Sequence, residues 1–384
     1  MTNRLRVTNM NHDAKEWLNV DFERKLARAA VLLMNPPKLE VGTTPSEVVY
    51  EDGKMRLLHY LPPNGGEQCR VPVLVVYALI NKPYILDLQP DRSVVGSLLS
   101  KGLDVYLIDW GTPTDSDRWN TLNDYVSWYL NDAVDFIRKR HGLRSISVLG
   151  YCMGGTLSVM FAALYPEKVK NLVLMAAPLD FEADDGLLKH WSRSEFFDVD
   201  KFVDSVGNVS SQFLNAGYMM LDPVNSLYSK YLRLIDMVDD EEFIKLFFRM
   251  EKWIFDGIPM AGEAYREFIK YLYQQNLLVK SQLKLGRRKV NLDRMKMPLL
   301  NIVAEADNLV PMASGVNFAD LVPSTDKKTF MFKTGHIGLS VGASSHSEMW
   351  PKVADWLRKR SNEESNDGPK PKREKPTRRK ASGA

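Results

Sequence analysis

The segment from Ile146 to Gly155 limits the possible folds more than any other part of this chain. It reads Ile-Ser-Val-Leu-Gly-Tyr-Cys-Met-Gly-Gly, an apolar run that enters a turn of small residues, and an apolar helical pattern follows to about Tyr165. A strand, a tight turn and a helix in this order match the nucleophile elbow G-x-S-x-G, with Cys152 in the serine position. The elbow holds its central residue above the edge of a parallel sheet, so we expect Cys152 to be exposed at that edge.

Strand and helix patterns alternate on both sides of this segment. The expected strands are 73–77, 104–108, 146–149, 171–175, 299–304 and 329–332, and the expected helices are 94–101, 121–141, 154–165 and 348–359. The helix at 121–141 begins with Thr-Leu-Asn-Asp, a capping-box pattern. Two earlier strands, 48–50 and 55–60, flank an Asp-Gly step that is typical of a hairpin. This order predicts an α/β fold with a mostly parallel sheet, helices on both faces and an antiparallel hairpin at one edge.

A long segment without strand patterns interrupts this alternation. Residues 182–295 have a helical pattern and many large aromatic side chains. An insertion between two halves of one sheet favours a cap over the functional edge. We therefore predict an N-terminal helical segment (1–40) with an amphipathic helix at 13–34, a core (41–181 and 296–360), a cap (182–295) and a disordered basic tail (361–384).

The overall charge and the cysteine content exclude several classes of protein. The chain has a net charge of +3, but the tail from Pro369 alone carries +6, which leaves the remainder at −3. A nucleic-acid-binding domain would carry its basic patch on folded structure, so no nucleic acid is expected as a partner. We see no secretion signal and no apolar run long enough to span a membrane. Two cysteines form no disulfide framework, which favours the cytoplasm.

Cys152 has to be weighed against an ordinary structural cysteine. Free cysteines are among the most buried residues, and we interpret Cys69, in a loop before a strand, in that way. Cys152 differs because a strand, glycines and a helix surround it. The positive end of the helix that follows would favour a thiolate and would help to stabilise an oxyanion.

A nucleophile in this arrangement needs a histidine and an acid later in the chain. His336 lies in the glycine-flanked loop after the last strand, whereas His190 lies in the predicted cap and His346 resembles a surface residue at a helix start. The acid should follow the strand at 299–304. Asp307 is the candidate there, and Glu305 is the alternative.

These motifs resemble the polyhydroxyalkanoate synthases, in which cysteine replaces the usual serine of a lipase-like box. The similarity extends in the family's order over roughly residues 40–360. The similar segments are 77–88, 105–111, 150–155, 256–259 with Gly262-Glu263, Asp307 with Val310-Pro311, and 335–338 with Trp350-Pro351. The short chain is similar to class III or class IV of the family.

The resemblance implies an α/β-hydrolase fold with an inserted helical cap and a triad of Cys152, Asp307 and His336. It also implies an oxyanion hole made by the backbone N–H groups of Met153 and Ile80. The expected substrate is an (R)-3-hydroxyacyl-CoA, preferably 3-hydroxybutyryl-CoA, with CoA as the leaving group and neither cofactor nor metal. The expected partners are a second synthase subunit, further copies of the chain in a homodimer or higher oligomer, and cytoplasmic polyester granules.

Other functions are compatible with the same motifs. A thioesterase, a depolymerase or another hydrolase would use the same elbow and triad, and so would a different acyltransferase. An inactive binding scaffold is the remaining alternative, although a complete set of triad residues argues against it.

Overall fold

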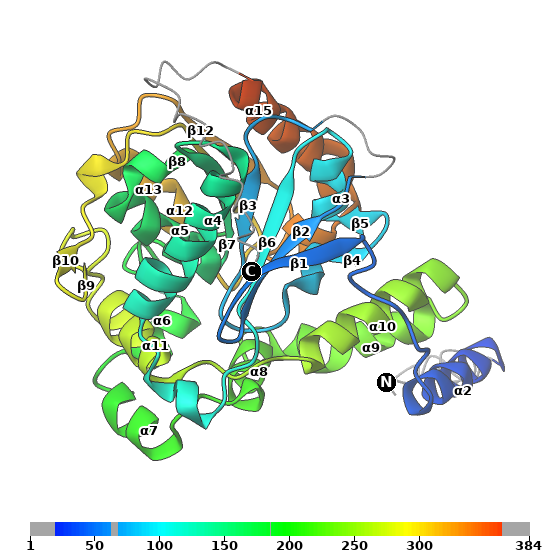
Figure 1. The fold of residues 1–384 in the computed structure, drawn as a ribbon. Coiled ribbons are helices and arrows are strands. Elements are labelled where there is room, and N and C mark those ends of the chain that lie inside the picture. Colours follow the sequence, from blue (N-terminus) through cyan, green and yellow to red (C-terminus); the bar gives the residue numbers. More distant parts are fainter. Residues whose placement is uncertain (1–19, 63–67, 185, 363–384) are drawn as a thin grey trace, which may run out of the picture.

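An eight-stranded sheet forms the centre of the computed structural model, which describes residues 20–62, 68–184 and 186–362 (Figure 1). The strand order is β1-β2-β6-β3-β7-β8-β11-β12. The first three strands pair antiparallel and all the others pair parallel. The strands are β1 (Ser46–Asp52), β2 (Met55–Tyr60), β3 (Val73–Val76), β6 (Val105–Asp109), β7 (Ile146–Tyr151), β8 (Val169–Met175), β11 (Leu299–Ala304) and β12 (Lys327–Phe332). The predicted parallel sheet with a hairpin at one edge is therefore confirmed.

Helices cover both faces of this sheet. Figure 1 shows α3 and α15 together on one side, and α4 and α5 on the other. The helices of the core are α3 (Val94–Leu99), α4 (Asn131–His141), α5 (Met153–Leu164), α12 (Met312–Val316), α13 (Phe318–Leu321), α14 (Gly338–Val341) and α15 (Trp350–Asn362). The central strands β3, β7 and β8 are almost entirely buried, as expected for parallel strands covered on both faces.

Local sequence explains how the helix before β7 begins. The backbone N–H of Thr121 donates to Asp124 Oδ2 (2.7 Å), and the N–H of Asp124 donates to Thr121 Oγ1 (3.3 Å). The predicted capping box is thus present. The helix that it starts is not uniform, because a π-helical stretch, η4 (Asp124–Leu130), precedes α4.

The segment between β8 and β11 carries no strand of the main sheet. Its helical elements are α6 (Leu187–Ser192), α7 (Val199–Val206), α8 (Ser211–Met219), η6 (Asn225–Ser229), α9 (Lys230–Asp236), α10 (Glu241–Phe255), α11 (Gly262–Glu267) and η7 (Phe268–Gln274). A small hairpin of β9 (Lys284–Leu285) and β10 (Arg288–Lys289) follows them. The prediction of a purely helical segment missed this hairpin because each strand has only two residues.

The N-terminal helix does not bury most of the large apolar side chains on its expected apolar face. The described part is α2 (Val20–Met34), and the predicted residues 13–19 lie outside the described residues. Phe22, Leu26 and Leu33 are exposed, whereas Ala29 is buried against the helices α9 and α10. Arg24 and Arg28 also pair with Asp239, so α2 is held by the inserted segment and not by the sheet.

The close contact between β7 and α5 requires glycine at two positions. A Cβ atom on Gly154 would lie 2.1 Å from the carbonyl oxygen of Val76, and one on Gly150 would lie 2.5 Å from the Cα of Gly155. Both obstacles are backbone atoms, which cannot rotate away. Glycine at these positions therefore allows α5 to start directly above the end of β7.

We expect Gly154→Ala to lower the free energy of unfolding by about 3 kcal/mol, because overpacking against backbone has to be relieved by moving α5. Gly217→Ala in α8 is the matched control, since a Cβ atom there meets nothing within 4 Å. The control should stabilise the helix by about 0.5–1 kcal/mol. Denaturant unfolding measures both changes, and similar stabilities of the two variants would contradict the packing described for the elbow.

Candidate active site

Cys152 occupies a strained turn between β7 and α5. Its backbone has φ 54° and ψ −129°, a conformation that a residue with a side chain adopts rarely. The backbone N–H of Cys152 donates to the carbonyl of Met175 in the neighbouring strand (2.9 Å). The turn therefore places the thiol at the carboxyl end of the sheet, at the N-terminus of α5.

His336 and Asp307 form a buried pair at the same edge of the sheet. Asp307 follows β11 and His336 follows β12, and these two strands are neighbours. The Nδ1–H of His336 donates to Asp307 Oδ2 (2.7 Å), and the two side chains are only 8% and 1% exposed. The other carboxylate oxygen accepts the backbone N–H groups of Leu309 (2.9 Å) and Val310 (2.8 Å). These bonds fix the carboxylate, and the carboxylate fixes the ring of His336.

The competing residues lie elsewhere. Glu305 is exposed and, among the described residues, its side chain has no hydrogen bond to His336. His190 belongs to α6 in the inserted segment. His346 was expected at the surface, but it is half-buried, and its ring nitrogens contact Ser97 Oγ (3.1 Å) and the carbonyl of Ser340 (2.7 Å). Its place is structural because η9 (Ser345–Met349) turns the ring towards α3 and α14.

Electrostatics favour a charged imidazolium at His336. Burial alone would lower its pKa, but the charge of Cys152 and the hydrogen bonds with Asp307 and Cys152 outweigh burial. Together they raise the pKa of His336 to about 10. Cys152, His336 and Asp307 are thus brought together in the order that proton transfer from the thiol requires.

Among the described residues, the backbone N–H groups of Met153 and Ile80 have no acceptor. Met153 is the first residue of α5, and Ile80 lies in the loop after β3. Both residues are buried and line the same cavity as Cys152. Across the described ranges, neither N–H donates a hydrogen bond to a protein acceptor. Paired donors of this kind are suited to bind an oxyanion that forms beside the sulfur.

Tyr151 is a site residue that the sequence analysis did not single out. Its ring stacks on that of His336, with centroids 5.3 Å apart, and its hydroxyl donates to the carbonyl of His336 (3.1 Å). The residue before the nucleophile therefore supports His336 through a ring contact and a hydrogen bond. An aromatic residue inside the elbow was the available signal, but its direction could not be derived from sequence.

A cavity of about 190 Å³ opens above Cys152. Its walls are largely apolar and come from the elbow, the loop after β3 and the inserted helices. The large side chains that line it are Leu188, Trp191, Phe197, Phe213, Tyr218, Met260, Tyr265, Phe268, Ile269 and Tyr273. The sulfur thus faces a space that favours an apolar acyl group over water.

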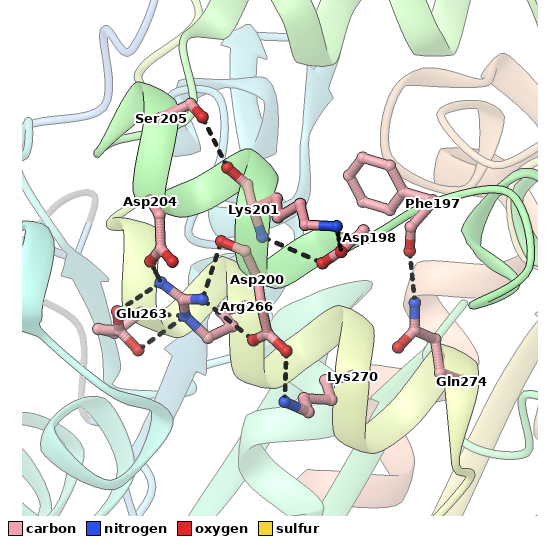
Figure 2. Close-up of polar contacts among 10 residues, drawn as sticks. All are labelled: Phe197, Asp198, Asp200, Lys201, Asp204, Ser205, Glu263, Arg266, Lys270 and Gln274. Carbon is pink, nitrogen blue, oxygen red and sulfur yellow. Dashed lines mark hydrogen bonds and ion pairs between the residues drawn. The ribbon is translucent and has the colours of Figure 1, made fainter.

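The side chain of Arg266 joins α11 to α7 beside this cavity (Figure 2). Its guanidinium donates to Asp200 Oδ1 (3.0 Å), to Asp204 Oδ1 (2.6 Å) and to Glu263. Gln274 donates to the carbonyl of Phe197 (3.1 Å). These contacts tie α7 and the loop before it to α11 and η7, two elements of the inserted segment that lie beside the cavity.

Comparison with known proteins bears on the family of this chain. Residues 71–343 match the family model of the alpha/beta hydrolase fold, and residues 13–98 match the N-terminus of poly-beta-hydroxybutyrate polymerase. The poly(3-hydroxyalkanoate) polymerase subunit PhaC of Synechocystis is 45% identical over 348 residues, 89% of this chain and 92% of that protein. The chain belongs to the poly(3-hydroxyalkanoate) polymerase family.

Other relatives agree with this membership. The PhaC subunit of Haloferax mediterranei is 50% identical and covers 86% of this chain and 67% of its own length. The PhaC subunit of Allochromatium vinosum is 41% identical, and the match covers 89% of this chain and 96% of that protein. The predicted family and enzyme class, an acyltransferase, are therefore confirmed.

Solved structures support the fold alone. A candidate lipase from Sulfolobus solfataricus has a TM-score of 0.50 at 13% identity and covers 82% of this chain and 99% of that one. This likeness, together with the family match, confirms the predicted α/β-hydrolase fold.

We expect His336 to remain protonated at pH 8 in the wild-type protein, because its pKa lies well above the ordinary value of about 6.5. Cys152→Ala removes a negative charge that favours the imidazolium, so the pKa of His336 should fall. NMR titration of labelled histidine measures the pKa of His336 in the wild type and in Cys152→Ala. The signal of His336 is assigned by its loss in His336→Gln. Cys69→Ala should leave the titration unchanged, and the same pKa in wild type and Cys152→Ala would disprove the coupling.

Proposed function

We propose that this enzyme builds polyester from (R)-3-hydroxyacyl-CoA, preferably 3-hydroxybutyryl-CoA, through a thioester on Cys152. The observation that carries the proposal is a cysteine in the elbow, beside the buried His336–Asp307 pair, at the floor of an apolar cavity. The names of the relatives add polymerisation of 3-hydroxyalkanoates to this geometry.

The first step starts from the pair in which His336 already holds the proton of Cys152, and the thiolate attacks the thioester carbonyl of the substrate. The carbonyl oxygen becomes an oxyanion that the N–H groups of Met153 and Ile80 bind. When the intermediate collapses, the bond to the CoA sulfur breaks, and CoA leaves with the proton held by His336. Loss of one oxyanion donor typically reduces the rate about 10²–10³-fold.

Cysteine suits this reaction because it keeps the acyl group activated. A thiolate that exchanges with a CoA thioester forms another thioester of similar energy. A serine would form an oxygen ester, and the driving force for the next bond would be lost. No electron transfer takes place, so we propose that the enzyme uses no cofactor and that CoA is only the leaving group.

Chain growth requires a second nucleophile. The 3-hydroxyl group of a bound unit attacks an acyl-enzyme thioester, which forms the ester bond and frees a cysteine. By resemblance to the family, Asp307 assists in activating this hydroxyl besides orienting His336. Water would compete in this step and end the chain, so the apolar lining of the cavity favours polymerisation.

We further propose that the enzyme acts with a second synthase subunit, in a homodimer or higher oligomer, on cytoplasmic polyester granules. The word subunit in the names of the relatives supports the first part. In the described ranges, no helix is long and apolar enough to cross a bilayer. The basic residues after Pro369 lie outside the described residues.

We expect the wild-type enzyme to release CoA from (R)-3-hydroxybutyryl-CoA and to form insoluble polyester, and we expect Cys152→Ala to be at least about 10³-fold slower. Cys69→Ala is the matched control and should retain activity. The assay measures free CoA and product size, with and without a partner subunit. CoA release that yields only free 3-hydroxybutyrate would reassign the enzyme as a thioesterase.

Loosening the contacts between α7 and α11 should let water reach the acyl-enzyme. Arg266→Ala removes a side chain that is only 17% exposed and takes its cation from Asp204 and Glu263, while Asp200 keeps its pair with Lys270. We expect the fraction of free 3-hydroxy acid among the products to rise several-fold. Lys201→Ala on the same helix α7 is the control, because its side chain is 86% exposed and pairs only with Asp198. Equal product fractions in both variants would show that Arg266 does not exclude water.

A further inference from the structure

Three tyrosine hydroxyls stand without partners in the apolar cavity. Tyr218, Tyr265 and Tyr273 all line it, and within the described part of the chain none of their hydroxyls makes a hydrogen bond to the protein. Their oxygens are also absent from the fully enclosed polar atoms that lack a partner, which are Ser127 Oγ and Asn301 Oδ1. The phenol oxygens are therefore not fully enclosed, and all three residues line the cavity, while Tyr273 also lines a smaller pocket beside Asp180.

Tyr218 and Tyr273 line one cavity together with Cys152. Burial raises the pKa of Tyr218 and Tyr273, and the negative charge of Cys152 raises both further. Burial alone raises the pKa of Tyr265 to about 12. Tyr218 and Tyr273 thus stay neutral near the sulfur and can each donate one hydrogen bond and accept another.

The two side chains come from separate elements of the inserted segment. Tyr218 belongs to α8 and Tyr273 to η7, so they approach the space above Cys152 from different parts of its wall. Of the other polar side chains in that wall, Ser192 already donates to the carbonyl of Lys189 (3.0 Å), and the indole N–H of Trp191 can donate but not accept.

Building on the proposed function, we propose that the hydroxyls of Tyr218 and Tyr273 bind the 3-hydroxyl group of the acyl unit at Cys152 and thereby select 3-hydroxyacyl thioesters over unsubstituted ones. The 3-hydroxyl lies two carbons from the thioester carbonyl, close to the sulfur. It offers one hydrogen to donate and lone pairs to accept, which matches two neutral phenols.

The selection follows from desolvation. An acyl group without a 3-hydroxyl displaces water from the cavity but leaves the two phenols with no partner, and an unpaired polar group in an apolar space is unfavourable. A site that hydrogen-bonds a hydroxyl of its substrate therefore discriminates strongly against the analogue that lacks it. Both tyrosines are specificity residues in this scheme, and the chemistry of acylation remains with Cys152 and His336.

The test compares acylation by (R)-3-hydroxybutyryl-CoA and by butyryl-CoA in single turnovers, with enzyme in excess and CoA release measured by chromatography. Tyr218→Phe and Tyr273→Phe each keep the ring and remove the hydroxyl. We expect each to slow acylation by the 3-hydroxy substrate about tenfold and to speed acylation by butyryl-CoA, because one phenol fewer is then left unpaired beside the butyryl group. Tyr271→Phe is the control, because Tyr271 lies on the same element η7 and does not line the cavity.

The outcomes separate this inference from the function on which it rests. Equal slowing of both substrates, or no slowing of either, would overturn selection by the tyrosines, provided that thermal unfolding shows the variants to be folded. Failure of the wild-type enzyme to release CoA from the 3-hydroxy substrate would overturn the proposed function itself. That failure would already appear before any tyrosine is changed.

Discussion

The close contact of β7 with α5 is the constraint on which the site depends. Gly150 and Gly154 let the helix start where the strand ends, and the chain can make this turn only if Cys152 adopts a positive φ. Such a backbone conformation stores strain, of order 1–3 kcal/mol, that the surrounding sheet has to offset. The buried parallel strands on both sides provide this support, and the result is a thiol that projects above the sheet edge with a helix N-terminus behind it.

The other half of the site is organised by charge. His336 and Asp307 follow neighbouring strands, so the register of β11 and β12 brings them together, although 28 residues separate them in the sequence. Backbone N–H groups hold the carboxylate, the carboxylate holds the ring, and Tyr151 supports the ring from the elbow itself. The nucleophile and its base are thereby connected through Tyr151 as well as through space.

Sequence reasoning found the parts that follow from chain order and local chemistry. The elbow at Cys152, the loop position of His336 and the capping box at Thr121 each depend on a few adjacent residues. It missed what depends on contacts between distant residues. These are the inward direction of Tyr218 and Tyr273, the joining of α7 to α11 by Arg266, and the outward apolar side of α2. The hairpin β9–β10 escaped notice because two-residue strands carry no periodic pattern. Asp307 was already the candidate from the sequence, and the structure adds its hydrogen bond to His336 and the exposure of the alternative, Glu305.

The size of the cavity bears on the product. A space of about 190 Å³ is similar to an engineered protein cavity of about 150 Å³ that holds one benzene molecule. It has room for roughly one short hydroxyacyl unit beside the sulfur, so all earlier units of a growing chain must lie outside it. Such a cavity contacts only the last unit of the chain. It therefore provides no means of measuring how many units the chain already has. The length of each polyester chain would then be a statistical quantity, set at every step by the competition between the next monomer and the event that ends growth.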